Sequence, residues 1–204
     1  TQQIILQNQF YEITIDPSRG GGIVSLLDKE SGKEVIQPGK GALGNELVFY
    51  EEYPGRGEGR WVLYPTGKKW YSRNYAVPGK LRQGPVSSSF ILEGPFEGGG
   101  RKQEIILYER LKRIDFLSTL IDFEDKQGLY KVHFPLQIKG GRPIFQAANA
   151  VIGRSFGYDT DYEEHRYTLD SPAYQWVEYG TNALVTVKDP GTEKTIAEYS
   201  LGVG

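Results

Sequence analysis

The sequence contains no cysteine, and this absence excludes disulfide bonds, thiolate metal ligands and a cysteine nucleophile. Without cysteine, the sequence also does not indicate whether the protein works in an oxidising or a reducing compartment. Histidine is scarce: His133 and His165 are the only two, and they lack the spacing of a zinc site. His133 alternates with apolar neighbours, so a structural or surface role is predicted for it. The acidic run 158–165 lacks the pattern of a calcium loop and is interpreted as a solvated loop.

The sequence also lacks a large excess of charge of either sign, and it lacks long apolar runs. Lysine and arginine number 24 and the acidic residues 26, for a formal net charge of -2, and without a long basic run nothing favours nucleic acid. No apolar run approaches the roughly 18 residues of a membrane span, and no signal peptide is visible. These absences predict a soluble protein; the cytoplasm is compatible with them, and the compartment stays open. A start at Thr1 and the lack of any methionine predict a processed chain or a piece cut from a longer one.

The motifs of several enzyme classes are absent as well. No Gly-x-Ser-x-Gly nucleophile elbow occurs, and Gly20–Gly22 is followed by neither a helix nor a phosphate-binding lysine. The carboxylates Asp122, Glu124 and Asp125 could by type hydrolyse a glycoside. Because Lys126-Gln127-Gly128 follows them, a hairpin tip is the simpler interpretation. We therefore predict that the chain carries no catalytic residue and no metal or other cofactor of its own.

Glycine and tyrosine are abundant, with 26 and 14 residues. Tyrosine favours half-buried pleated surfaces and glycine closes turns between strands. The segment Phe10–Ile15 alternates, with Tyr11, Ile13 and Ile15 on one face. A glycine-rich turn, the apolar run 23–27, a polar loop and the short partner 34–36 follow, which together predict a β-meander.

Further strands are predicted from β-branched and aromatic content. They cover residues 46–50, 61–64, 70–75, 86–92, 104–109, 114–123, 129–138, 174–179 and 183–187. Gly98–Gly100 is predicted as a hinge or hairpin tip, and Pro135 marks a sheet edge or a bulge. With no amphipathic helix of normal length, no repeat and no linker, the sequence predicts one large β-sandwich domain over residues 1–204, with antiparallel sheets and little helix.

Aromatic side chains are the one positive sign of a binding function. A short window rich in arginine and lysine contains Trp61, Tyr64, Trp70, Tyr71 and Tyr75. Aromatic rings stack on the C–H faces of sugars, while charged neighbours bind hydroxyls. The alternative is that alternate rings fill the core of the sandwich, and we expect this of at least half of them.

An ordered set of motifs gives the chain a family resemblance. It begins with Asn8-Gln9-Phe10 and Gly21-Gly22-Ile23-Val24-Ser25-Leu26-Leu27-Asp28-Lys29, continues with Gly44-Asn45-Glu46-Leu47, Arg113-Ile114-Asp115-Phe116 and Phe134-Pro135-Leu136, and ends with Ile152-Gly153-Arg154 and Trp176-Val177-Glu178. In this order, from about Leu6 to Asp189, the chain resembles the C-terminal β-domain of glycoside hydrolase family 38, the α-mannosidases. The segment 55–67 departs from the pattern of the microbial members of this family. The resemblance therefore leaves the substrate specificity open.

The resemblance implies a galactose-mutarotase-like supersandwich. It also implies that zinc and an aspartate nucleophile belong to an N-terminal α/β barrel, which no segment of this chain matches. Zinc is thus expected in that missing catalytic domain. Together with the aromatic window, the resemblance makes Trp61, Tyr64, Arg154 and Trp176 the candidate substrate-binding residues, with Trp61 nearest to an aromatic that reaches the sugar in Golgi and lysosomal members.

Three functions remain open at this point. The first is a non-catalytic β-sandwich of an α-mannosidase-like enzyme, which buttresses the N-terminal catalytic domain of the same chain and contributes contacts to α-mannosides. The second is a stand-alone carbohydrate-binding module. The third is a sandwich used only for structure or assembly, which an exposed sheet edge or apolar patch would support.

Overall fold

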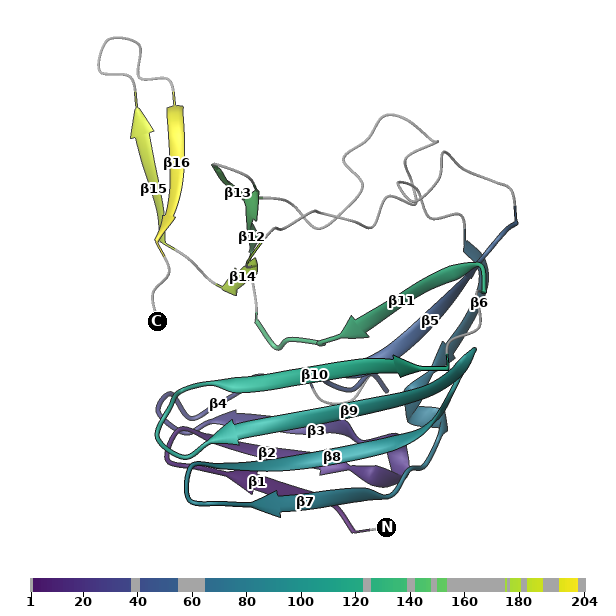
Figure 1. Cartoon of the computed structure of the whole chain (residues 1–204). Helices are drawn as coiled ribbons and strands as arrows, with labels where there is room; N and C mark the ends of the chain where they lie inside the picture. The colour runs from purple at the N-terminus through teal and green to yellow at the C-terminus, as the bar shows by residue number, and fades with distance from the viewer. Residues whose placement is uncertain are drawn as a thin grey trace. The chain divides into compact units, whose positions relative to one another are not determined.

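The structure, a computed structural model, describes residues 2–37, 41–54, 65–122, 126–138, 142–147, 150–153, 175, 177–180, 183–188 and 195–201 (Figure 1). The chain divides into two compact units. Unit 1 comprises Thr1–Arg56 and Leu63–Gln137, and unit 2 comprises Gly57–Val62 and Ile138–Gly204. The single sandwich domain predicted for residues 1–204 stays a prediction.

The first sheet of unit 1 is antiparallel, with the strand order β1-β2-β3-β4. Its strands are β1 (Ile4–Gln7), β2 (Tyr11–Asp16), β3 (Gly22–Asp28) and β4 (Lys33–Glu34). The predicted meander is therefore confirmed as β2-β3-β4, while β1 was not predicted. In the turn after β2, Gly20 has a φ of 67°, and a Cβ there would lie 2.1 Å from the Ser72 carbonyl oxygen, so this position requires glycine.

The second sheet of unit 1 has the order β10-β9-β8-β7 and is also antiparallel. Its strands are β7 (Gly79–Gln83), β8 (Ser87–Phe96), β9 (Gly99–Tyr108) and β10 (Ile114–Ile121). The predicted hairpin tip is confirmed, because β8 turns into β9 at residues 97–98 and Gly98 has a φ of 87°. The edge strand β7 is exposed along its whole length and was missed.

The core of unit 1 lies between these two sheets. It contains Leu6, Ile13, Ile15, Ile23 and Leu26 from the first sheet, Phe90, Leu92, Ile105 and Leu107 from the second, and Ile36 and Val77. Each such side chain contributes roughly 1.5–3 kcal/mol when it is fully buried. Two antiparallel sheets packed face to face in this way make a β-sandwich, so the predicted fold class is confirmed.

The third sheet of unit 1 has the order β11-β5-β6. Its strands are β5 (Glu46–Glu52), β6 (Pro65–Tyr71) and β11 (Gly128–His133). The strand predicted over residues 70–75 is wrong in its bounds, because β6 ends at Tyr71 and the 3-10 turn η3 (Ser72–Asn74) follows. There the buried Ser72 hydroxyl accepts a hydrogen bond of 3.1 Å from the Leu47 amide. The strand predicted to reach Ile138 ends at His133, before Pro135, on the sheet edge.

A buried polar cluster lies where the sheets of unit 1 meet. Arg101 in β9 is fully buried, and its Nη2 donates a 2.8 Å hydrogen bond to the Gly20 carbonyl oxygen. Its Nη1 donates to the Gln103 side chain, whose Nε2 donates to the Asn45 carbonyl oxygen at 3.0 Å. Burial lowers the pKa of Arg101 to about 10. These bonds join the turn after β2, β9 and the start of β5.

Unit 2 contains a three-stranded antiparallel sheet of order β13-β12-β14 and the hairpin β15-β16. Its strands are β12 (Arg142–Ala147), β13 (Ala150–Gly153), β14 (Val177–Gly180), β15 (Ala183–Lys188) and β16 (Thr195–Leu201). Helical structure among the described residues is limited to the two 3-10 turns η1 (Pro17–Arg19) and η3. None of the described helices is long and apolar enough to span a membrane.

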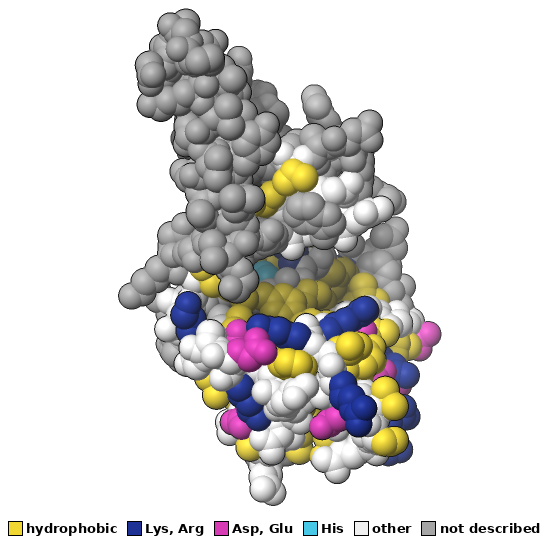
Figure 2. All heavy atoms as spheres, turned by 90° about the vertical axis from the view of Figure 1, so that its left-hand side faces the viewer, with side chains coloured by type: hydrophobic (Ala, Val, Ile, Leu, Met, Phe, Trp, Pro, Cys, Tyr) yellow, Lys and Arg dark blue, Asp and Glu magenta, His cyan; other side chains and the backbone are white. Residues whose placement is uncertain are grey.

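Charged side chains of both signs are interspersed over the surface of unit 1 (Figure 2). Hydrophobic side chains gather in a band beside them in the same view. The exposed large hydrophobic residues of unit 1 include Leu117 and Leu120 in β10, Val132 in β11, and Phe134.

Candidate functional site

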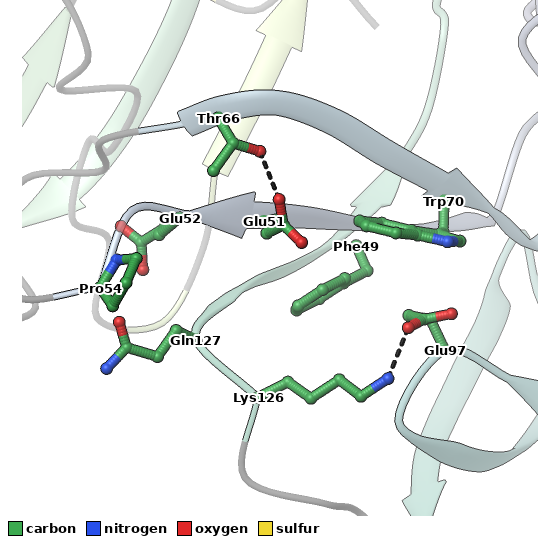
Figure 3. Close-up of a pocket in the computed structure, with 9 residues that line it drawn as sticks. All are labelled: Phe49, Glu51, Glu52, Pro54, Thr66, Trp70, Glu97, Lys126 and Gln127. Atoms are coloured by element: carbon green, nitrogen blue, oxygen red, sulfur yellow. Dashed lines mark hydrogen bonds and ion pairs between the residues drawn. The ribbon is translucent and has the colours of Figure 1, made fainter.

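A hollow of about 480 Å³ opens beside the β11-β5-β6 sheet (Figure 3). Its apolar lining comes from Phe49, Trp70 and Pro54, and its polar lining from Glu51, Glu52, Thr66, Glu97, Lys126 and Gln127. These residues come from β5, β6, the β8–β9 turn and the segment before β11. The hollow thus brings together parts of the chain that are far apart in the sequence.

The floor of the hollow follows from the alternation of strand side chains. Phe49 is paired with Trp70 on one side and with Tyr130 on the other, so the three rings share one face of the sheet. The Phe49 ring centre lies 5.7 Å from that of Trp70 and 4.7 Å from that of Tyr130. Phe49 is buried, whereas Trp70 is half-buried. Packing therefore holds the indole in place while leaving part of it accessible.

One rim of the hollow is the Glu51 carboxylate. The Thr66 hydroxyl donates a 2.7 Å hydrogen bond to Glu51 Oε2, and Lys68 Nζ lies 3.3 Å from the same oxygen. The Thr66 hydrogen bond is the main cause of a lowered Glu51 pKa, and Lys68 adds to it. Glu51 is therefore ionised at neutral pH. Because a general acid needs a raised pKa, Glu51 is suited to accept hydrogen bonds from a ligand and not to protonate one.

The facing rim is a tether between the β8–β9 turn and the segment before β11. Lys126 Nζ lies 2.5 Å from Glu97 Oε1, and the Tyr130 hydroxyl donates a 2.5 Å hydrogen bond to the Glu97 carbonyl oxygen. Figure 3 shows Glu97 and Lys126 on the side of the Phe49 ring away from Glu51 and Thr66. The hollow thus has carboxylate groups on two sides of an aromatic floor.

Such a combination suits a polyhydroxylated ligand. An accessible indole offers a flat apolar surface for sugar C–H groups, and carboxylates, an amine and an amide offer acceptors and donors for hydroxyls. Among the described residues, no group of three or more His, Asp or Glu side chains is placed to hold a metal ion.

The four candidate substrate-binding residues, Trp61, Tyr64, Arg154 and Trp176, lie outside the described residues, and so do Glu124, Asp125 and the acidic run 158–165. Asp122 follows β10 with a φ of 48°. These predictions stay predictions.

The other three rings of the aromatic window, Trp70, Tyr71 and Tyr75, lie among the described residues, and each has different surroundings. Trp70 lines the hollow. Tyr75 packs edge-on against the buried Phe96 with ring centres 5.9 Å apart, as expected for a core ring. Tyr71 lies on the opposite face of β6, where the Arg73 guanidinium is 4.0 Å from its ring centre. The window therefore supplies one ring to the hollow and one to the core.

The polar lining of the hollow was missed at the sequence level. The predicted strand 46–50 stops before Glu51 and Glu52, Lys126 stands only in a predicted hairpin tip, and Glu97 belongs to no predicted feature. No local pattern marks them, because register and the tether from Lys126 to Glu97, 29 residues away, bring them together.

Residues 6–187 match the family model described as the glycosyl hydrolases family 38 C-terminal domain. A search among curated proteins finds no match.

Proposed function

Because the chain belongs to the C-terminal domain family of family 38 glycosyl hydrolases, we propose that it serves as the non-catalytic sandwich of an α-mannosidase-like enzyme. In this proposal it buttresses a catalytic barrel and contributes contacts to α-mannosides. Zinc and the aspartate nucleophile belong to that barrel, and the sandwich supplies a rigid surface. Trp61, Tyr64, Arg154 and Trp176 remain the proposed sugar contacts from the family resemblance.

The observation that carries the sugar-binding part of the proposal is the hollow around Trp70. Its half-buried indole packs on Phe49, with ring centres 5.7 Å apart, so little conformational entropy is lost when a sugar stacks on it. The ionised Glu51 and the paired Glu97 and Lys126 supply polar contacts at the rim. This arrangement favours binding over catalysis, since the Glu51 pKa is lowered.

Calorimetric titration of the chain with mannose and α-manno-oligosaccharides tests the binding part. We expect millimolar binding that Trp70→Ala weakens about 10-fold or more, because the stacking surface is removed. Tyr71→Ala is the matched control, since it removes a ring from the adjacent position on the opposite face. Binding that is unchanged in Trp70→Ala would assign the sugar contacts to another surface.

Turnover of an aryl α-mannoside by the same chain tests the non-catalytic part. We expect none above the buffer rate. Measurable turnover in the absence of any barrel would overturn the proposal. A chain that neither turns over mannosides nor binds them would restrict the function to buttressing.

A further inference from the structure

The strand β7 is a sheet edge that is open in the part of the chain that the structure describes. It pairs with β8 on one side in an unbroken antiparallel register, and no described strand pairs with its other side (Figure 1). Every residue of β7 is exposed. Because alternate backbone amide and carbonyl groups of an edge strand point away from its neighbour, β7 presents donors and acceptors with which another extended chain can pair.

This edge is held in place at both ends. Before β7 begins, the amide of the buried Val77 donates a 3.1 Å hydrogen bond to the Pro17 carbonyl oxygen. After β7 ends, the Gly84 amide donates a 3.0 Å hydrogen bond to the Ser87 carbonyl oxygen and closes the turn into β8. A strand that is already ordered loses little conformational entropy when a partner binds, so β7 is suited to accept one.

The side chains of β7 divide between the two faces of the sheet. Leu81 is paired with the buried Phe90 and therefore lies on the core side, where it is 44% exposed. Lys80 and Arg82 lie on the outer side, because successive side chains of a strand alternate. Residues two apart on a strand are separated by roughly 6–7 Å. The alternate side chains of one added strand have the same spacing, so a single strand can meet both cations.

The positive charge of this edge is not neutralised by any described carboxylate. The ion pairs among the described residues include neither Lys80 nor Arg82. Like charges directly opposite each other destabilise a pair of strands, and a second copy of β7 paired antiparallel about Leu81 would place Lys80 opposite Arg82. Such charges protect an edge against self-pairing. The same charges favour an added strand that carries carboxylates.

We infer that β7 binds an extended acidic segment of a partner protein, which adds to the four-stranded sheet as a further strand. In this arrangement, two carboxylates at alternate positions lie beside Lys80 and Arg82, and an apolar side chain between them lies beside Leu81. Main-chain hydrogen bonds supply affinity, and the charge pattern selects the partner. Since β7 and the hollow belong to different sheets, the inference is independent of sugar binding.

The probe is a capped, fluorescently labelled peptide of sequence Ser-Thr-Glu-Val-Glu-Thr-Ser, and fluorescence anisotropy measures its binding to the 204-residue chain. The control peptide carries lysine in place of both glutamates. We expect the acidic peptide to bind saturably and the basic peptide to bind about 10-fold more weakly or not at all. Amide hydrogen exchange in β7 should slow when the acidic peptide is bound.

Charge reversal on the protein tests the role of the two cations. In the double variant Lys80→Glu, Arg82→Glu the preference should invert, so that the basic peptide binds more tightly than the acidic one. The matched control is Lys33→Glu, Arg110→Glu, which changes the net charge equally at exposed positions outside β7 and should keep the original preference. A preference for the acidic peptide that persists after reversal at Lys80 and Arg82 would overturn the inference.

Methylation of the peptide's backbone nitrogens separates strand addition from attraction between charges alone. Methyl groups on one alternate set of amides should abolish binding, because those amides face β7, and methyl groups on the other set should leave it. Binding that survives in both methylated peptides contradicts strand addition, and so does a failure of the unmodified acidic peptide to bind. A dimer of the chain that dissociates after reversal at Lys80 and Arg82 would assign the edge to a second copy and reject the acidic partner.

Discussion

Asn8 Nδ2 donates a 2.7 Å hydrogen bond to the backbone carbonyl oxygen of Tyr108, 100 residues away in the sequence. The Oδ1 of the same amide accepts hydrogen bonds from the backbone amides of Phe10 and Tyr11, at 2.8 and 2.7 Å. Asn8 therefore shapes the turn between β1 and β2 and links the first sheet of the sandwich to the end of β9 in the second.

Replacing Asn8 with alanine should therefore lower the stability of the fold. The variant leaves two amides and one carbonyl oxygen without partners at a site where Asn8 is 7% exposed. We expect a loss of about 2–4 kcal/mol in the free energy of unfolding, measured by urea denaturation. Asn74→Ala is the control, since Asn74 is exposed and should change stability by less than about 0.5 kcal/mol. Equal effects of the two substitutions would show that the link between the sheets contributes little.

The turn at Asn8 also explains why the sequence predicted part of this fold well. The motif Asn8-Gln9-Phe10 is the first of the ordered set that carries the family resemblance. In the structure its asparagine makes the three hydrogen bonds that place β1, β2 and β9 together. Strands such as β2 and β9 alternate between buried and accessible side chains, so their period of two was visible. Local pattern and tertiary environment agree at these positions.

Other elements could not be predicted because their sequences carry no such pattern. β7 is exposed at every residue, with Leu81 as its only large apolar side chain. β6 begins at Pro65 and carries Lys68 and Lys69, and its aromatic residues come only at its end. Which face Trp70 and Tyr71 take depends on their pairing with Phe49 and Val48, and that register is a tertiary property.

The approach of β11 to β5 gives a second prediction, at Gly128. A Cβ at this position would lie 2.3 Å from the Tyr50 carbonyl oxygen and 2.4 Å from the Phe49 ring. Gly128→Ala should therefore displace β11 or the Phe49 ring at a cost of about 1–3 kcal/mol, measured by thermal or urea unfolding. The substitution should also lower the affinity of any ligand that binds in the hollow, because the Phe49 ring packs against Trp70.

Gly84→Ala is the matched control for this substitution. A Cβ at Gly84 would meet only the Ser87 carbonyl oxygen, at 3.5 Å, which is an ordinary contact. Its stability should change little or rise slightly, because alanine restricts the unfolded chain. If the Gly128→Ala variant is as stable as the Gly84→Ala variant, β11 does not pack closely on Phe49 at this position.

The last prediction concerns the pH dependence of stability and the ion pair of Glu46 with Arg73. Burial is the main cause of a raised Glu46 pKa, and Arg73 opposes it. A carboxyl whose pKa is higher in the folded state stabilises the fold below its unfolded pKa, and this contribution is lost as the pH rises through the folded value. Arg73 limits that loss because it stabilises the ionised form. In Arg73→Ala the Glu46 pKa should rise further, and the loss of stability toward neutral pH should be larger.

We therefore expect Arg73→Ala to lower the free energy of unfolding by about 3–5 kcal/mol at neutral pH, where it leaves a buried charge unpaired. The cost should be clearly smaller at about pH 4, where Glu46 is protonated. Adding Glu46→Gln should recover part of it at neutral pH. Lys112→Ala removes a pair of similar geometry, 2.5 Å from Glu30, but both side chains are largely exposed, so it should cost less than about 1 kcal/mol. A cost of Arg73→Ala that is equal at both pH values would mean that Arg73 acts through its stacking on Tyr71 and not through Glu46.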